Sequence, residues 1–182
     1  MRLAALIVVA MLVASGTGAA APRPDPRSLV LRKRDVPSSY TILRAHTGVL
    51  SNAAAAQGNR DLIAGFKSWL RLTGYNVEYQ GGIKGTIGTR ADVFASSRGA
   101  RSMLQWVVAG TPSSTGLEFV RREPSVGDGA YVYRKDFGTL LFVVVEWRFR
   151  NIYAHIGADG VGVRGALALA RVQQSRIEAA LK

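Results

Sequence analysis

The most constraining feature of this sequence is a pair of alternating apolar segments joined by two polar residues. Leu140–Phe149 is the strongest predicted strand, and Ile152–Ile156 follows it directly after Arg150-Asn151. A two-residue connection between two strands produces an antiparallel hairpin. With this turn Trp147 faces Ala154, and a shift of one residue would move every apolar side chain to the opposite face. The fold must therefore contain an antiparallel sheet built around this hairpin.

The hairpin has one apolar face and one mixed face. The apolar face is expected to pack in the core and consists of Val145, Trp147, Phe149, Ile152, Ala154 and Ile156. The mixed face starts with Phe142 and Val144 and ends with the candidate ligand-binding residues Glu146, Arg148, Tyr153 and His155. Because unpaired charge is costly to bury, this gradient suits a half-open surface or the mouth of a groove. The alternative is an edge hairpin whose charges discourage aggregation.

In the same register Glu146 faces His155 across the hairpin. A carboxylate beside an imidazole perturbs its titration, which is useful in catalysis, although an ordinary surface pair has the same pattern. The chain has two histidines and no nucleophile elbow, and neither histidine has a metal-type companion nearby. The sequence therefore assigns no catalytic residue, no metal site and no cofactor.

The rest of the chain predicts an α+β fold, with an antiparallel sheet of about five to six strands packed with three to four helices. Helices are expected over residues 28–34 and 59–72, from Ser96 or Ser97 to a loop at 110–116, and over 163–181. Thr73-Gly74 is interpreted as a helix stop, and residues 46–58 as a loop with a helical turn. Trp69, Trp106 and Trp147 are all expected to be at least partly buried.

Two glycine-containing turns invite comparison with ligand-binding loops. Residues 157–162 precede the last helix, so Gly160, Gly162 and Arg164 form a candidate anion site on its first amides, with a flexible connection as the alternative. Residues 126–130 lack both the Lys-Ser/Thr of a phosphate loop and the repeated acidic residues of a calcium loop. They are interpreted as a turn that begins a hairpin.

The N-terminus has the order of a secretory signal. Arg2 precedes an uncharged apolar run over residues 3–14, and small residues follow at 19–21. We therefore expect a signal peptide at 1–20, a proline-rich linker at 21–27 and a single α+β domain at 28–182; an uncleaved membrane anchor is the alternative. The chain has no cysteine, which excludes a lipoprotein and any disulfide.

The mature domain is expected to be strongly basic. Loss of Arg2 with the signal lowers the formal net charge from +12 to +11. Such a charge attracts polyanions, and outside the membrane these are an anionic envelope polymer or lipid headgroups rather than nucleic acid. An envelope protein is a further candidate partner. The alternative is an arginine-rich solvated surface without a specific partner.

The C-terminal third, with its Val-Gly-Asp turn, its hairpin around Arg148–Ile152 and its alanine-rich helix, resembles exported envelope domains of high-GC bacteria. These include the extracellular sensor domains of some membrane serine/threonine kinases, which are similar in turn to PsbP/Mog1-like α/β sandwiches. Residues 35–41 resemble their opening segment. The kinase sensor domains usually carry cysteine pairs, which this chain lacks. The resemblance implies a fold and a compartment, but no ligand.

Three function classes follow from these observations. The first is a non-enzymatic, secreted or envelope-associated module that binds a ligand or a partner. The second is an enzyme with a dispersed site that includes His155 and Glu146. The third is a structural or accessory envelope protein without a small ligand. An enclosed cavity holding His155 and Glu146 would favour the enzyme, and an open groove would favour the binding module.

We predict that the mature protein begins near Ala21 and is released or loosely held at the cell surface, because a signal peptidase would cut after the small residues there. N-terminal sequencing of the extracellular fraction measures this directly. A chain that keeps Met1 and sediments with membranes would support the uncleaved anchor instead.

Overall fold

The computed structural model describes residues 23–182, apart from the side chains of Lys84 and residues 111–114. The predicted signal peptide lies outside this range. An eight-stranded antiparallel sheet dominates the described residues, with the order β1-β3-β4-β8-β7-β6-β5 and with β2 also paired to β3. The strands are β1 (Thr41–Ile42), β2 (Gly48–Leu50), β3 (Arg71–Gln80), β4 (Thr86–Phe94), β5 (Glu118–Glu123), β6 (Ala130–Asp136), β7 (Leu141–Phe149) and β8 (Ile152–Asp159).

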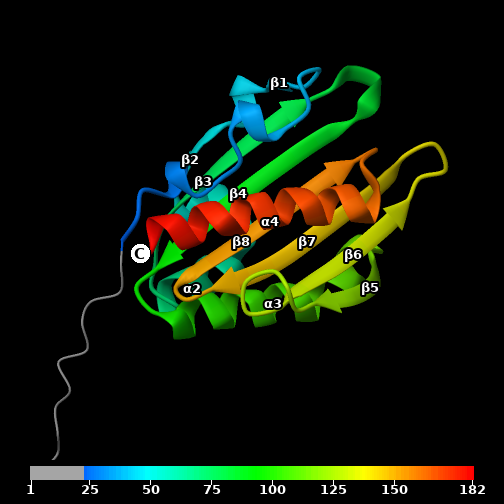
Figure 1. Ribbon diagram of the computed structural model, residues 1–182. Helices are drawn as coiled ribbons and strands as arrows, with labels where there is room; N and C mark the ends of the chain where they lie inside the picture. Colours follow the sequence, from blue (N-terminus) through cyan, green and yellow to red (C-terminus); the bar gives the residue numbers. More distant parts are fainter. Residues whose placement is uncertain (1–22) are drawn as a thin grey trace, which may run out of the picture.

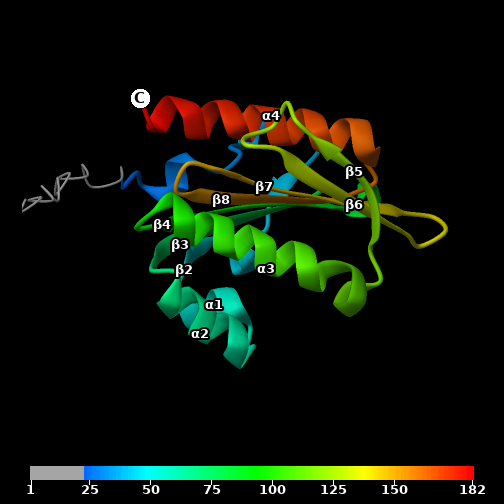
Figure 2. The ribbon, with the colours of Figure 1, turned by 90° about the horizontal axis from the view of Figure 1, so that it is seen from below.

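Helices cover both faces of the sheet (Figures 1 and 2). Figure 2 shows α4 alone on one side and α3 on the other, with the short α1 and α2 beyond it. The helices are α1 (Asn52–Ala56), α2 (Arg60–Ser68), α3 (Ser97–Thr115) and α4 (Gly162–Ala180), with 3-10 turns η1 (Pro26–Ser28), η2 (Lys33–Asp35), η3 (Arg44–His46) and η4 (Gly82–Lys84). The α+β class with an antiparallel sheet is confirmed.

The sheet has more strands than the sequence predicts. The unpredicted strand at one edge is the three-residue β2, which pairs with β3 beside the two-residue β1, where the sequence predicts an extended segment at 40–43. Residues 46–58, expected as a loop with a helical turn, contain β2 and α1. Strands this short carry no detectable alternation, so only their pairing with β3 defines them.

The N-terminal segment packs differently from the expected helix over 28–34. It forms η1 and η2, with Leu29, Val30 and Leu31 all buried between them. Three consecutive buried side chains do not fit one side of a surface helix. The packed chain begins before Ser28, because Pro26 is already buried. Asp35 then anchors this segment to α4 through the guanidinium of Arg176 at 2.8 Å and 2.9 Å.

The predicted register of the central hairpin is confirmed. Glu146 pairs with His155 and Trp147 pairs with Ala154. The apolar face lies under α4, where the fully buried Trp147 donates its indole N–H to Gln174 Oε1 at 2.9 Å. Gln174 and Gln173 are the two buried polar residues of α4, and hydrogen bonds to Trp147 and to Thr89 account for them.

The three tryptophans differ in burial. Trp147 is fully buried and Trp69 is partly buried, with its ring edge-on to Phe66. Trp106 is the most exposed of the three, with 36% of its surface accessible, so it is partly buried. Met103 and Leu104 bury α3 against the sheet, so Trp106 lies at the side of the helix rather than beneath it.

We predict that Trp147→Ala lowers the free energy of unfolding by about 3–5 kcal/mol, because it leaves a large cavity under α4. The matched Trp106→Ala should cost clearly less, since 36% of the Trp106 surface is already exposed. Urea denaturation of both variants measures the difference. Equal losses would contradict the burial described above.

Candidate functional site

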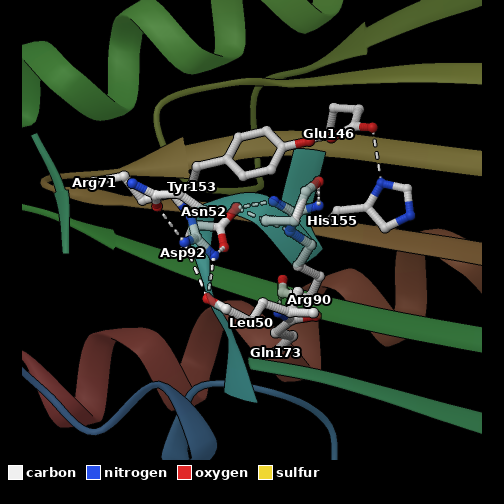
Figure 3. Close-up of polar contacts among 10 residues, drawn as sticks. Leu50, Asn52, Arg71, Arg90, Asp92, Glu146, Tyr153, His155 and Gln173 are labelled. Atoms are coloured by element: carbon white, nitrogen blue, oxygen red, sulfur yellow. Dashed lines mark hydrogen bonds and ion pairs between the residues drawn. The ribbon is translucent and has the colours of Figure 1, made fainter. Parts of the chain in front are cut away.

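The sheet face beneath α3 carries an uninterrupted group of polar side chains at the centre of the fold (Figure 3). Its middle is Asp92 on β4, whose side chain is completely buried. One carboxylate oxygen accepts from Arg71 Nη2 at 2.7 Å, and the other accepts from Arg90 Nε at 2.9 Å. Two guanidinium groups therefore share this carboxylate in charge-assisted hydrogen bonds.

Arg71 reaches Asp92 because of local backbone features at the start of β3. Leu70 adopts a left-handed φ of 56° after α2, and the β3–β4 register shifts between Arg71 and Thr73. Gly74 is not the predicted helix stop. A Cβ at this position would lie 2.0 Å from Asp92 Oδ1, so glycine makes room for the ion pair.

Arg71 also joins the α1 segment to the sheet. Its Nη1 donates to the Leu50 carbonyl at 3.1 Å and to Asn52 Oδ1 at 2.9 Å. Burial lowers the pKa of Arg71, and the charge of Asp92 opposes that shift. Its guanidinium carbon lies 4.9 Å from the centre of the Phe66 ring. One arginine thus connects β2, α1, α2 and β4.

A second cluster consists of three of the predicted ligand-binding residues, Glu146, Tyr153 and His155. Glu146 is buried, and its two oxygens have different partners. One accepts from the Tyr153 hydroxyl, and the other lies 2.8 Å from His155 Nδ1. Burial raises the pKa of Tyr153 well above its ordinary value of 10.0, and the charge of Glu146 raises it further. Tyr153 therefore remains a hydrogen-bond donor.

The two clusters adjoin each other across β4 and β8. Asp92 is in register with Tyr153, and Arg90 is in register with His155. Burial alone would lower the pKa of Arg90, but the charges of Asp92 and Glu146 raise it above its ordinary range. The whole group is thus electrostatically coupled through Arg90.

A cleft of about 440 Å³ opens beside this group. Gly88 and Gly157 are paired in register on its floor, where the space above Gly88 is open and the side chains of His155 and Phe142 lie against Gly157. Its lining includes Glu146, Tyr153, Arg90 and His155 from the sheet, and Met103, Trp106 and Val107 from α3. The exposed Trp106 lies on this lining, and the cleft is open to solvent rather than enclosed. It will be called the α3 cleft.

Arg148, the fourth predicted ligand-binding residue, does not join the others. It lines a separate cavity on the other side of α3, where its Nη1 lies 2.6 Å from Asp128 Oδ2. The candidate anion residues Gly160, Gly162 and Arg164 lie at the start of α4, on the opposite face of the sheet (Figure 2). Gly160 and Gly162 have positive φ values, and Arg164 is exposed. The structure does not place them near the α3 cleft.

Sequence reasoning missed Arg71, Arg90 and Asp92. A signal for Asp92 was present, because it is a lone carboxylate within the otherwise apolar segment 91–94. A charge in a strand that is buried on both faces requires a partner. No comparable signal identifies Arg71, whose role depends on the bulge and on Gly74.

Metal sites and membrane-spanning helices are both absent from the residues that the structure describes. No group of three histidine or acidic side chains there could hold a metal ion. No helix there has the length and apolar character needed to cross a membrane.

Comparison with known proteins gives one solved structure that informs the fold. The extracellular domain of PknH from Mycobacterium tuberculosis is similar with a TM-score of 0.55 and 9% sequence identity, over 87% of this chain and all of that domain. No model of a known protein family matches the sequence. No curated protein matches it either. The likeness therefore establishes a shared fold with an extracellular domain of a high-GC bacterium.

We predict that Asp92→Asn lowers the free energy of unfolding by about 3–5 kcal/mol, because it leaves two guanidinium groups beside a neutral partner in the interior. Glu118→Gln is the matched control, since Glu118 pairs with Arg134 at 3.6 Å on the surface and should contribute less than about 1 kcal/mol. Urea denaturation compares the two variants, and similar losses would argue against a central role for Asp92.

Proposed function

We propose that this protein is an exported, non-enzymatic binding module of the cell envelope that holds a small ligand in the α3 cleft. The observation that carries the proposal is the cleft itself, with open space above Gly88 beside the hydrogen-bonded Glu146–Tyr153–His155 group. The volume of the cleft is typical of small-molecule sites, and so is its lining, in which apolar and aromatic side chains surround a small number of polar groups.

The charges of the cleft favour an uncharged or weakly cationic ligand. Its ionisable lining consists of two carboxylates, Glu78 and Glu146, one guanidinium, Arg90, and His155. Arg90 is engaged by Asp92, and Glu146 is engaged by Tyr153 and His155. His155 Nε2 is therefore the polar atom of this group left for a ligand, while Trp106 and Met103 offer apolar contact.

Export and envelope association are part of the same proposal. They are supported by the N-terminal signal pattern and by the fold shared with an extracellular domain. The helix–sheet–helix layering agrees with the proposed kinship to PsbP/Mog1-like sandwiches and to kinase sensor domains. We propose that the ligand or partner is a component of the envelope.

An enzyme is the second candidate, and the Glu146–His155 hydrogen bond favours it. A buried carboxylate that orients an imidazole is a common arrangement in acid–base catalysis. Against it, no hydroxyl among the described residues hydrogen-bonds to His155 Nε2. The geometry supplies an oriented histidine without an adjacent nucleophile, and this supports binding.

A cleft-filling variant tests the proposal. A Cβ at Gly88 would meet only the Gly157 carbonyl oxygen, at 3.7 Å, so Gly88→Val should fold while its side chain occupies the cleft. The matched control is Gly48→Val, because Gly48 is a strand glycine outside the cleft with nothing within 4 Å of a Cβ. Each purified mature protein is incubated with envelope extract, and the bound small molecules are compared by mass spectrometry.

We expect wild type and Gly48→Val to retain a compound that Gly88→Val loses, and that compound to be recovered unchanged. Equal retention by all three proteins would remove the α3 cleft as the site. Recovery of a chemically altered compound that requires His155 would establish the enzyme instead. Retention of no compound would favour a structural role.

A further inference from the structure

The second cavity beneath α3 is an arginine pocket of about 350 Å³. It lies between α3 and strands β5 to β7, and its charged residues are Arg101, Arg122, Arg148 and Asp128. Tyr131, Leu104 and Val108 supply apolar surface. It is distinct from the α3 cleft, because Arg101, Leu104 and Val108 lie on one side of α3, whereas Met103, Trp106 and Val107 lie on the other.

The arginine pocket carries an excess of positive charge. Arg148 is paired with Asp128 at 2.6 Å, which accounts for one guanidinium. Arg101 and Arg122 have no carboxylate partner among the residues that the structure describes. Both residues are exposed, so water solvates their guanidinium groups in the free protein, and a ligand with about two negative charges would complement both.

Part of the pocket is held in place before any ligand arrives. The turn between β5 and β6 is fixed to β7, since the Asp128 N–H donates to the Arg148 carbonyl at 2.9 Å. Gly129 has φ 106°, and a Cβ there would lie 3.0 Å from Arg122 Nε, so glycine lets this guanidinium lie against the turn. The Arg122 guanidinium also covers the Tyr131 ring at 5.5 Å. Residues 126–130 are thus a turn that shapes the pocket.

We propose that the arginine pocket binds the dianionic phosphate group of a small organic phosphate monoester. Guanidinium forks match phosphate oxygens in charge and geometry, and a monoester supplies close to two negative charges. The cavity has room beyond the phosphate, and Leu104, Val108 and Tyr131 provide contact for an apolar organic part. The same group occurs in soluble phosphate esters and in the headgroup of phosphatidic acid.

The test uses phenyl phosphate as the probe, with binding to the mature protein followed by calorimetry and by NMR chemical shifts. Arg122→Gln and Arg101→Gln should each weaken binding roughly tenfold or more, because each removes charge-assisted hydrogen bonds. Arg121→Gln is the matched control on the same strand, since the exposed Arg121 pairs with Glu123 at 3.0 Å. Arg164→Gln tests the start of α4, and Gly88→Val tests independence from the α3 cleft.

A variant that binds phenyl phosphate more tightly than wild type distinguishes a binding role of the arginine pocket from a purely structural one. Asp128→Asn frees Arg148 and should strengthen phenyl phosphate binding a few-fold, whereas damage to the fold would weaken it. Vesicles of phosphatidylcholine with and without phosphatidic acid distinguish the two sources. Competition by these vesicles identifies the lipid headgroup, and its absence identifies a soluble ester.

The expected result is loss of binding in Arg101→Gln and Arg122→Gln, gain in Asp128→Asn, and affinities within about twofold of wild type in the other variants. The proposal is overturned if phenyl phosphate does not bind, or if Arg121→Gln or Arg164→Gln weakens it as much as Arg122→Gln does. Because Gly88→Val leaves this pocket intact, failure here and failure of the α3 cleft are separate outcomes.

Discussion

The buried carboxylate of Asp92 is the interaction on which the rest of this structure depends. It lies between Arg71 and Arg90 and has no access to solvent. Through Arg71 it connects the central sheet to the β2–α1 segment, whose Leu50, Ala55 and Ala56 also pack in the apolar cluster below α3. Arg90, its second partner, is in register with His155 of the neighbouring cluster. An apolar residue at position 92 would leave both guanidinium groups without their carboxylate.

The polar side chains around Asp92 explain why one face of the sheet is covered by α3 and still borders two cavities. The face beneath α4 is apolar and is sealed by Trp147, Ile152 and Ile156. The face beneath α3 contains charges, so α3 covers it without sealing it, and a cavity remains on each side of the helix. The cavities differ in charge because carboxylates line the α3 cleft, whereas arginines surround the other. The α3 helix thus lies between two cavities whose linings differ in charge.

The sequence predicts the central hairpin because alternating apolar residues and a two-residue turn are local signals, which do not depend on the rest of the fold. It therefore identifies Glu146, Tyr153 and His155 as one face, and their pairing follows from the register. It does not separate Arg148 from them, because the position of α3 between the two cavities depends on long-range packing. The burial of Glu146 is also unexpected from the sequence, because it depends on the covering helix α3. The hydrogen bonds to Tyr153 and His155 compensate the carboxylate for the water that it loses.

The hydrogen bonds of Glu146 restrict what the α3 cleft can recognise. One oxygen of Glu146 accepts a hydrogen bond from the Tyr153 hydroxyl, and the other lies 2.8 Å from His155 Nδ1. Both carboxylate oxygens are therefore engaged, and His155 Nε2 is the atom of this group that a ligand can reach. Glu78 and Glu146 line the α3 cleft, whereas Arg101, Arg122 and Arg148 line the arginine pocket. Carboxylates repel a phosphate dianion and guanidinium groups attract it, so the two cavities on either side of α3 favour ligands of different charge.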